Sequence, residues 1–167
     1  FGMLFKGPYH VEALMRLPFI WCPVPSAKIA PANIDAPVGH VDLAPTICAI
    51  AGLPVPGWMQ GKPLPTNPAD ACGHERTITE WQDGFAGKHI VMRTLYRDGY
   101  ICTVYEATNY YDGDDIGELY DLSDDPLQWR NLWDHPARQS LKSDLIADLY
   151  DNLPPGRAEP LEKVAQV

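Results

Sequence analysis

Lys6 and His10 are the first residues of the chain whose types and spacing suit chemistry, in the stretch FKGPYH at 5–10. A lysine amine is a compact positive charge with three hydrogen-bond donors, which suits the binding of an anion. Histidine transfers protons near neutral pH, and His10 would lie one helical turn from Lys6 if a helix begins early. The local sequence also allows a solvated surface lysine and a partly buried structural histidine.

Further charged residues beside these two have structural explanations. Glu12 and Arg16 are four apart in the helical stretch PYHVEALMR at 8–16. They could act as a carboxylate and an anion clamp, but this spacing favours an ion pair on the exposed side of a helix. His40 precedes Asp42 at the entrance of a second helix, and we interpret it as structural.

An acidic loop, YYDGDDIG at 110–117, invites a calcium interpretation. Its oxygen donors are Asp112, Asp114 and Asp115, followed by Glu118. The EF-hand pattern needs an oxygen ligand at its fifth position, which Ile116 occupies here. We therefore expect a solvated loop.

The four cysteines stand far apart and none forms a C-x-x-C pair, which disfavours a metal knuckle. They are Cys22, Cys48, Cys72 and Cys102. We interpret them as reduced, mostly buried thiols of a cytosolic protein, and disulfides stay open.

The first third of the chain has the pattern of an α/β segment. After the helix at 8–16, LPFIWCPVP at 17–25 is nearly all apolar, which is typical of a strand buried on both faces of a parallel sheet. A second helix is expected from Asp42, as its N-cap, to a stop at Gly52.

From residue 76 the apolar period changes from helical to alternating. The alternating runs are RTITEWQD at 76–83, HIVMRTLYRD at 89–98, YICTVYEA at 100–107 and ELYDL at 118–122. The Asp98-Gly99 pair between two of them is a strong hairpin signal. A helix is expected near 135–152, so this part predicts an antiparallel sheet with one packed helix.

Size and charge exclude several classes of protein. The chain has 167 residues, about one ordinary domain, and a net charge of -9, which argues against a nucleic-acid partner. No apolar run approaches the ~20 residues of a membrane span, so no membrane partner is expected. The start carries neither an initiator methionine nor a signal-peptide pattern, so we expect a processed N-terminus or a piece of a longer protein.

Four stretches have the order and spacing of a known family. They are FKGPYHVEALMRLPFIW at 5–21, PVGHVDLAPTICAIAGLPVP at 37–56, MQGKPL at 59–64 and ELYDLSDDPLQWRNL at 118–132. Together they resemble the C-terminal half of the sulfatase family, within the alkaline-phosphatase superfamily. The family pattern reads Lys-Gly, a short helix ending in Arg-x-Pro, then V-x-x-x-D-x-x-P-T, Q-G-x-x-L and L-Y-D-L-x-x-D-P-x-E-x-x-N-L.

The resemblance implies a fold, an activity and site residues. The fold would be α/β, with 1–65 as the C-terminal end of an alkaline-phosphatase-like core. Residues 66–153 would form a small antiparallel-sheet subdomain with a helix, and 154–167 a peripheral tail. The activity would be hydrolysis of sulfate esters, with Lys6 as the catalytic, sulfate-binding lysine and His10 beside the substrate.

The resemblance also implies cofactors and partners. Calcium or another divalent cation and a formylglycine nucleophile would belong to the parent protein, with no metal ligand in this chain. The missing N-terminal catalytic half and a small sulfated substrate would be the partners, and a homo-oligomer stays open. The isolated chain would be inactive, since catalytic groups that act as a unit are not partly replaceable.

Cys22 does not fit the nucleophile of this family. The formylglycine pattern is C-x-P-S-x-R, whereas this chain has CPVPSAK at 22–28, with proline one place late and no arginine at the required spacing. It also follows the Lys-Gly motif, where the family's cysteine comes far upstream. We interpret Cys22 as a residue at the end of a strand.

Two alternatives to the sulfatase interpretation stay open. One is a phosphodiesterase or phosphonate monoester hydrolase of the same superfamily, and the other is a non-catalytic binding module. The aromatic residues of the C-terminal part also have two interpretations, the mouth of a substrate cleft or core packing. They are Trp81, Tyr105, Tyr110 and Tyr111.

Overall fold

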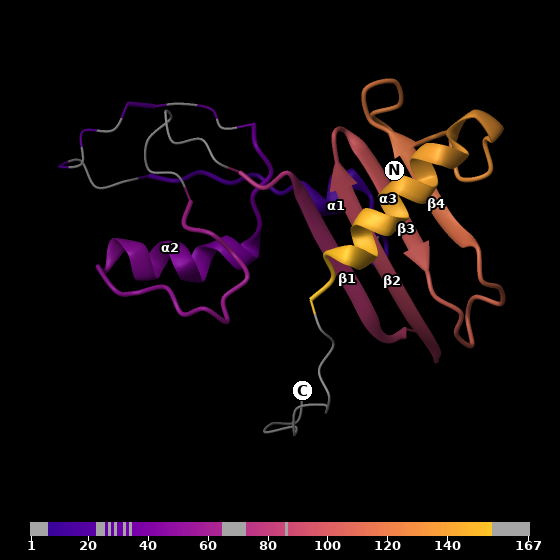
Figure 1. Cartoon of the computed structure of the whole chain (residues 1–167), viewed down its shortest axis with the longest axis horizontal. Coiled ribbons are helices and arrows are strands. Elements are labelled where there is room, and N and C mark those ends of the chain that lie inside the picture. The colour runs from indigo at the N-terminus through magenta and orange to yellow at the C-terminus, as the bar shows by residue number, and fades with distance from the viewer. Residues whose placement is uncertain are drawn as a thin grey trace.

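A four-stranded antiparallel sheet forms the centre of the chain, with its strands in the order β1-β2-β3-β4 (Figure 1). The computed structural model describes residues 7–22, 26, 28, 30–31, 33, 35–64, 73–85 and 87–154. The strands are β1 (Arg76–Phe85), β2 (Lys88–Arg97), β3 (Tyr100–Tyr105) and β4 (Ile116–Asp121). The sheet predicted from the alternating pattern is confirmed.

The turn between β2 and β3 fixes their register. Asp98 and Gly99 both have positive φ, 52° and 80°. These values are typical of the two-residue hairpin turn that an Asp-Gly pair favours. Because side chains alternate along a strand, Leu95 then points to one face of the sheet and Thr94 to the other.

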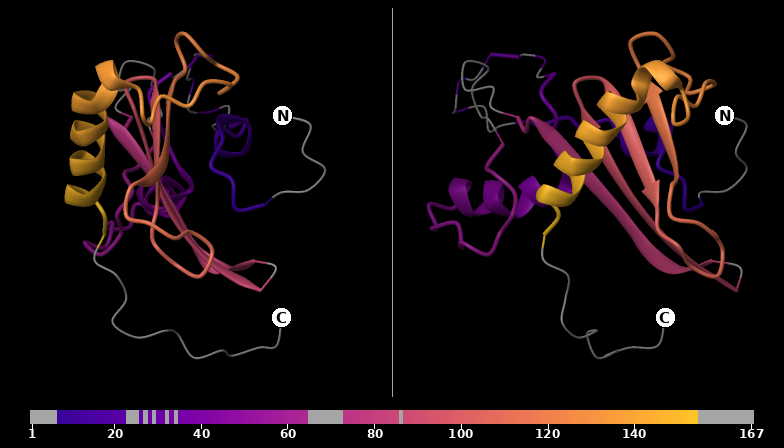
Figure 2. Two further views of the ribbon diagram at one scale, coloured as in Figure 1. Left: turned by 90° about the vertical axis from the view of Figure 1, so that its right-hand side faces the viewer. Right: turned by 45° about the vertical axis from the view of Figure 1, so that its right-hand side comes forward.

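Helix α3 (Gln139–Asp151) covers the face that carries Leu95, after a 3-10 turn at Pro136–Arg138. Figure 2 shows α3 on one side of the sheet and the N-terminal segment on the other. The core between α3 and the sheet consists of Leu95, Cys102, Leu119, Trp133, Leu145 and Leu149. Burial raises the pKa of Cys102 to about 12, so this thiol is a packing group.

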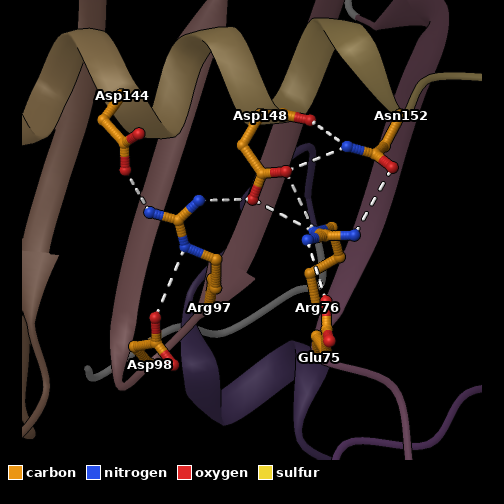
Figure 3. A network of polar contacts seen from close by, with 7 residues as sticks. All are labelled: Glu75, Arg76, Arg97, Asp98, Asp144, Asp148 and Asn152. Atoms are coloured by element: carbon orange, nitrogen blue, oxygen red, sulfur yellow. Dashed lines mark hydrogen bonds and ion pairs between the residues drawn. The ribbon is translucent and has the colours of Figure 1, made fainter.

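Two arginines at the edge of the sheet bind one aspartate of α3 (Figure 3). Nη1 of Arg97 donates to Oδ2 of Asp148 over 2.6 Å, and Nε of Arg76 lies 3.0 Å from Oδ1 of the same carboxylate. Arg97 also pairs with Asp144, and Nδ2 of Asn152 donates to Asp148. Asp144, followed by Asp148, raises the pKa of Arg97, although burial acts to lower it. The network fastens α3 to β1 and β2.

The first helix, α1 (Glu12–Met15), lies on the face of the sheet opposite α3 (Figure 2). It is shorter than the helix expected at 8–16. Nη1 of Arg16 lies 3.0 Å from Oε1 of Glu12, so the predicted ion pair is confirmed.

Residues 17–22 form no strand, so the prediction of a buried strand at 17–25 is wrong for them. Residues 23–25 lie outside the described residues. Leu17, Phe19 and Ile20 are exposed, Ile20 by 90%. A central strand needs neighbours that pair its backbone and cover both faces. The described part of the chain supplies neither at this place.

Helix α2 (Leu43–Ile50) follows a 3-10 turn at His40–Asp42 and lies beside the sheet in Figure 1. Gly52 has φ +67° just after the helix, and Leu53 N donates to Cys48 O over 2.9 Å, so the predicted glycine stop is confirmed. None of the helices in the described residues is long and apolar enough to cross a bilayer. The domain boundaries at residues 65 and 153 stay predictions.

Candidate functional site

Lys6 lies outside the described residues, so the site is built from the residues that follow it. Tyr9 N donates to Gly7 O over 2.8 Å, which closes a tight turn. A Cβ on Gly7 would lie only 2.7 Å from the ring of Tyr9. A larger residue here would displace the ring of Tyr9, which is exposed and can move, and Pro8 beside it is buried.

His10 is buried against the sheet on the face opposite α3. Its Nδ1 lies 2.7 Å from Oγ1 of Thr94, which in turn lies 2.8 Å from Oγ1 of Thr103. Burial lowers the pKa of His10 to about 4, so the ring is neutral at neutral pH. This position accounts for a structural histidine, and a contact of His10 with substrate stays a prediction.

The N-terminus of α1 is held by a residue of the last motif. Oε1 of Gln128 accepts a hydrogen bond from Glu12 N over 2.8 Å, and Gln128 is only 9% exposed. Its Nε2 is buried without a partner in the described part of the chain. Arg16 projects into solvent, with 81% of its side chain exposed, which favours the structural interpretation of Glu12 and Arg16.

Asp42 organises the region around α2. It is 1% exposed, and three N–H groups donate to its carboxylate over 2.8 Å: Gly39 N, Lys62 N and Nε2 of His74. Burial acts to raise the pKa of Asp42, but the two backbone donors and then His74 outweigh it and lower the pKa. Asp42 has the N-cap position of α2 as expected, yet its side chain makes no cap bond there and joins distant segments instead.

The motifs D-x-x-P-T and Q-G-x-x-L form one buried unit. A Cβ on Gly61 would lie 2.1 Å from Val41 O, so a larger residue would collide with the backbone before Asp42. Leu64 N donates to Oγ1 of Thr46 over 2.8 Å, and that hydroxyl donates to Asp42 O over 2.5 Å. In these two motifs, the residues that match the family pattern therefore stabilise the local fold. Sequence reasoning missed His74, which belongs to no motif.

The last motif covers the edge of the sheet formed by β4. Leu119 N in β4 donates to Oδ1 of Asn131 over 3.0 Å, and Leu132 N donates back to Leu119 O over 2.8 Å. Nδ2 of Asn131 donates to Gly117 O over 3.1 Å. The segment thus pairs with an edge strand that would otherwise expose its backbone.

A carboxylate and several aromatic rings share the sheet face that carries His10. Burial raises the pKa of Glu118, although the hydroxyls of Tyr105 and Tyr120 act to lower it. The Tyr105 hydroxyl donates to Oε1 of Glu118 over 3.0 Å. The aromatic residues of interest divide: Tyr105 is 8% exposed and packs in the core, whereas Tyr110 is 52% exposed. Core packing therefore applies to Tyr105, and a place for Tyr110 at the mouth of a substrate cleft stays a prediction.

Cys22 follows no strand in the described residues, so its interpretation as a strand-end residue is wrong. His40 is exposed in the 3-10 turn before α2, and Cys22 is exposed. Within the described residues no group of three or more His, Cys, Asp or Glu side chains is placed to hold a metal ion. The divalent cation and the formylglycine that the resemblance implies therefore enter no step derived from these residues.

The chain matches the family model described as N-sulphoglucosamine sulphohydrolase, C-terminal, over residues 3–153. It is 26% identical to the uncharacterized sulfatase YidJ of Escherichia coli K12 over 156 residues. This match covers 90% of this chain and 29% of that protein. The chain thus spans less than a third of the length of this curated relative.

Solved structures show the same relationship. A structure described as a candidate sulfatase from Bacteroides thetaiotaomicron is 28% identical with a TM-score of 0.55, covering 66% of this chain and 23% of that one. The structure of BT1596, described as a 2-O GAG sulfatase, gives the same identity, TM-score and coverage. With a family match that spans the Lys-Gly, Asp42 and Asn131 motifs, the chain belongs to the sulfatases, in the family of N-sulphoglucosamine sulphohydrolase C-terminal regions.

Proposed function

We propose that the protein to which this chain belongs hydrolyses sulfate esters, and that this chain supplies a sulfate-binding lysine, Lys6. The observation that carries the proposal is the family match over residues 3–153, which includes the Lys-Gly motif. The chain's similarity to other sulfatases supports the proposal.

Cleavage of a sulfate ester requires that negative charge on the sulfate oxygens be held in the transition state. A fixed cation close to these oxygens does this best where water is excluded. The amine of Lys6 suits the task as a compact charge with three donors. The turn at Gly7 and the buried contacts of His10 would limit its movement, since the chain after Lys6 is fixed.

The nucleophile and the metal ion would come from parts of the protein outside this chain. Formylglycine would supply the nucleophile, and calcium or another divalent cation would supply positive charge beside the sulfate oxygens. This chain alone would then be inactive, because the groups act as a unit.

The remainder of the sulfatase fold would cover apolar side chains that this chain exposes. They include Ile47 in α2, which is 64% exposed, Trp58 after it, which is 77% exposed, and Ile20, which is 90% exposed. Exposed apolar area of this kind marks a site of contact with another protein surface. The curated relative has more than two thirds of its length outside the matched region, which is enough chain to supply the cover.

Turnover of an aryl sulfate by the full-length protein, with calcium supplied, tests the proposal. Lys6→Ala is expected to lower kcat by about 10²–10³, the usual effect of removing one transition-state donor. Lys6→Arg is expected to restore activity only in part, because a planar fork replaces a point charge. The control is Lys28→Ala, which removes a lysine that is exposed in the structure and should leave turnover unchanged.

Parallel assays with a phosphate diester and a phosphonate monoester separate the related hydrolases. Undiminished aryl sulfate turnover in Lys6→Ala would refute the role of Lys6. Faster turnover of either phosphorus substrate than of the sulfate would refute the assignment of substrate. Turnover by the isolated 167-residue chain would refute the view that its catalytic partners lie elsewhere.

A further inference from the structure

Residues 7–16, which we call the strap, lie on the face of the sheet opposite α3 (Figure 2). Within the strap only Pro8 and His10 are buried, and α1 buries none of its side chains. A helix of four residues is too short to be stable by itself. The strap therefore keeps its position through its contacts with the sheet and the loops beside it.

Two hydrogen bonds in the described part of the chain fasten the strap. Nδ1 of His10 lies 2.7 Å from Oγ1 of Thr94 in β2, and Glu12 N donates to Oε1 of Gln128 over 2.8 Å. Gln128 lies in the segment that follows β4, so the two bonds reach different parts of the fold. Neither bond belongs to the backbone pairing of the strands. The strap can therefore separate without breaking any bond between strands.

The sheet surface that receives His10 is polar. Thr79, Thr94, Thr103 and Glu118 lie directly opposite one another across the four strands. Opposite residues of antiparallel strands share a face, so these side chains form one row. Oγ1 of Thr94 lies 2.8 Å from Oγ1 of Thr103, and each threonine is 1% exposed. Water can bond to these hydroxyls once the strap leaves, so their exposure costs little.

The neighbouring row on the other face of the sheet is apolar. Ile78, Leu95, Cys102 and Leu119 lie opposite one another on the same strands and pack in the core under α3. Separation of α3 would expose this apolar surface at a large cost. On the face of the strap, Ile101 is buried but belongs to neither core cluster of the described residues. We therefore expect the sheet and α3 to stay folded when the strap leaves.

Protonation of His10 opposes the bound position of the strap. Burial lowers the pKa of this ring to about 4, whereas a hydrated histidine has a pKa of 6.5. Detachment hydrates the ring and returns its pKa to the higher value. The detached form therefore takes up a proton as the pH falls through 6.5, and the bound form does not until about pH 4.

Other titratable or charged side chains on this face must be separated from the effect of His10. They are Tyr96 of β2, Tyr105 of β3, Glu118 and Tyr120 of β4, Asp125 beside Tyr120, and Tyr9, Glu12 and Arg16 of the strap. Burial raises the pKa of Glu118, so its loss of a proton favours detachment as the pH rises, which is opposite to His10. A comparison that removes His10 and keeps Glu118 isolates the histidine.

We propose that the strap is released by acid: residues 7–16 detach from the sheet as a unit when His10 is protonated, while the sheet and α3 stay folded. The polar row and the two isolated hydrogen bonds make detachment possible, and proton uptake drives it. Between pH 7 and pH 5 the equilibrium constant for detachment is expected to rise about 20-fold through His10. Detachment requires no role of this chain in sulfate hydrolysis, so it does not depend on the proposed function.

Hydrogen exchange of the full-length protein, followed by mass spectrometry, tests the proposal. The amides of Leu14, Met15 and Arg16 donate within α1 and report on the strap, and a peptide at 141–149 reports on α3. After correction for the intrinsic effect of pH on exchange, the opening constant of the strap is expected to be about 20-fold larger at pH 5 than at pH 7. Urea at low concentration should leave exchange of the strap unchanged and accelerate that of α3, because only unfolding exposes a large surface.

Three variants assign the effect to its cause. His10→Gln should lose the 20-fold dependence on pH, whereas His89→Gln, which replaces an exposed histidine, should keep it. Glu118 is present in both variants, so its opposite effect cancels in the comparison. Gln128→Ala keeps His10 and removes the second hydrogen bond, so the strap should open about tenfold more at both pH values.

Strap amides that urea accelerates as much as those of α3 would overturn the proposal, because the strap would then separate only by global unfolding. Equal opening at pH 7 and pH 5 would also overturn it, as would a rise of the same size in His10→Gln. If His10→Gln does not fold, Gln128→Ala supplies the decision. Opening in that variant that is independent of urea and rises about 20-fold at pH 5 would support the strap, and opening without this rise would overturn it.

Discussion

Acidification is expected to destabilise the chain through His10. This ring is 8% exposed and hydrogen-bonded to Thr94, and burial lowers its pKa from 6.5 to about 4. In the unfolded chain the ring takes up a proton as the pH falls through 6.5, whereas the folded chain does not bind that proton until about pH 4. The contribution of His10 to stability is therefore complete above pH 6.5 and is lost as the pH falls from there towards 4.

The size of the effect follows from the shift in pKa. A difference of about 2.5 pKa units corresponds to about 3 kcal/mol once the pH is below both values. Between pH 7 and pH 5 the unfolded state gains most of its proton, so about 2 kcal/mol of unfolding free energy is expected to disappear. Other titrating groups act over the same range, so the comparison must isolate His10.

Urea unfolding followed by tryptophan fluorescence, at pH 7 and pH 5, supplies this comparison. His10→Gln removes the titration and keeps a polar side chain, so its own stability should change less with pH than that of the unaltered chain. The stability gap between the two should shrink by about 2 kcal/mol at pH 5. His89→Gln is the control, since His89 is exposed. A gap of equal size at both pH values, or a His10 ring that titrates near 6.5 by NMR, would refute the reasoning.

Two further substitutions test the packing that surrounds the site. Gly61→Ala should destabilise the chain by about 3 kcal/mol, because the new Cβ collides with Val41 O. Gly57→Ala is the control, since its Cβ meets open space. Equal melting temperatures of the two variants would contradict this reasoning. Asp148→Ala should cost about 2–4 kcal/mol in urea unfolding, since it leaves two half-buried arginines without their shared partner. Asp144→Ala removes a carboxylate that is 64% exposed and should cost less than about 1 kcal/mol, so equal losses would show that the network is not centred on Asp148.

The C-terminal sheet was predictable because its signals are local. Alternation of apolar residues identifies each strand, and the pair at Asp98 and Gly99 needs only its own backbone preference to form a hairpin. The stop of α2 at Gly52 is equally local. These elements occur in the structure where the sequence indicates them.

The partners of buried polar groups were not predictable because they are distant in sequence. Asp42 has the position of an N-cap, yet its carboxylate binds His74, 32 residues away. Nothing in the local pattern of His74 distinguishes it from a solvated histidine. The strand prediction for the apolar run failed over residues 17–22 because it too depends on distant parts of the chain. Its composition indicates a buried strand, but burial depends on neighbouring strands that the described residues do not include.

Distant contacts also tie the segment that follows Lys6 to the sheet. His10 reaches Thr94 across 84 positions, and Glu12 reaches Gln128 across 116. A segment this short has few contacts of its own, so its position depends on the stability of the sheet that receives it. Under the proposed role of Lys6, a substitution that loosens the sheet would also misplace the lysine. Asp148 lies on the opposite face and touches neither His10 nor Glu12 in the contacts described. If kcat falls in Asp148→Ala and recovers at a temperature well below the melting transition of this variant, the loss acts through the stability of the sheet. A loss of kcat that persists at low temperature would instead require a direct role for α3 in catalysis.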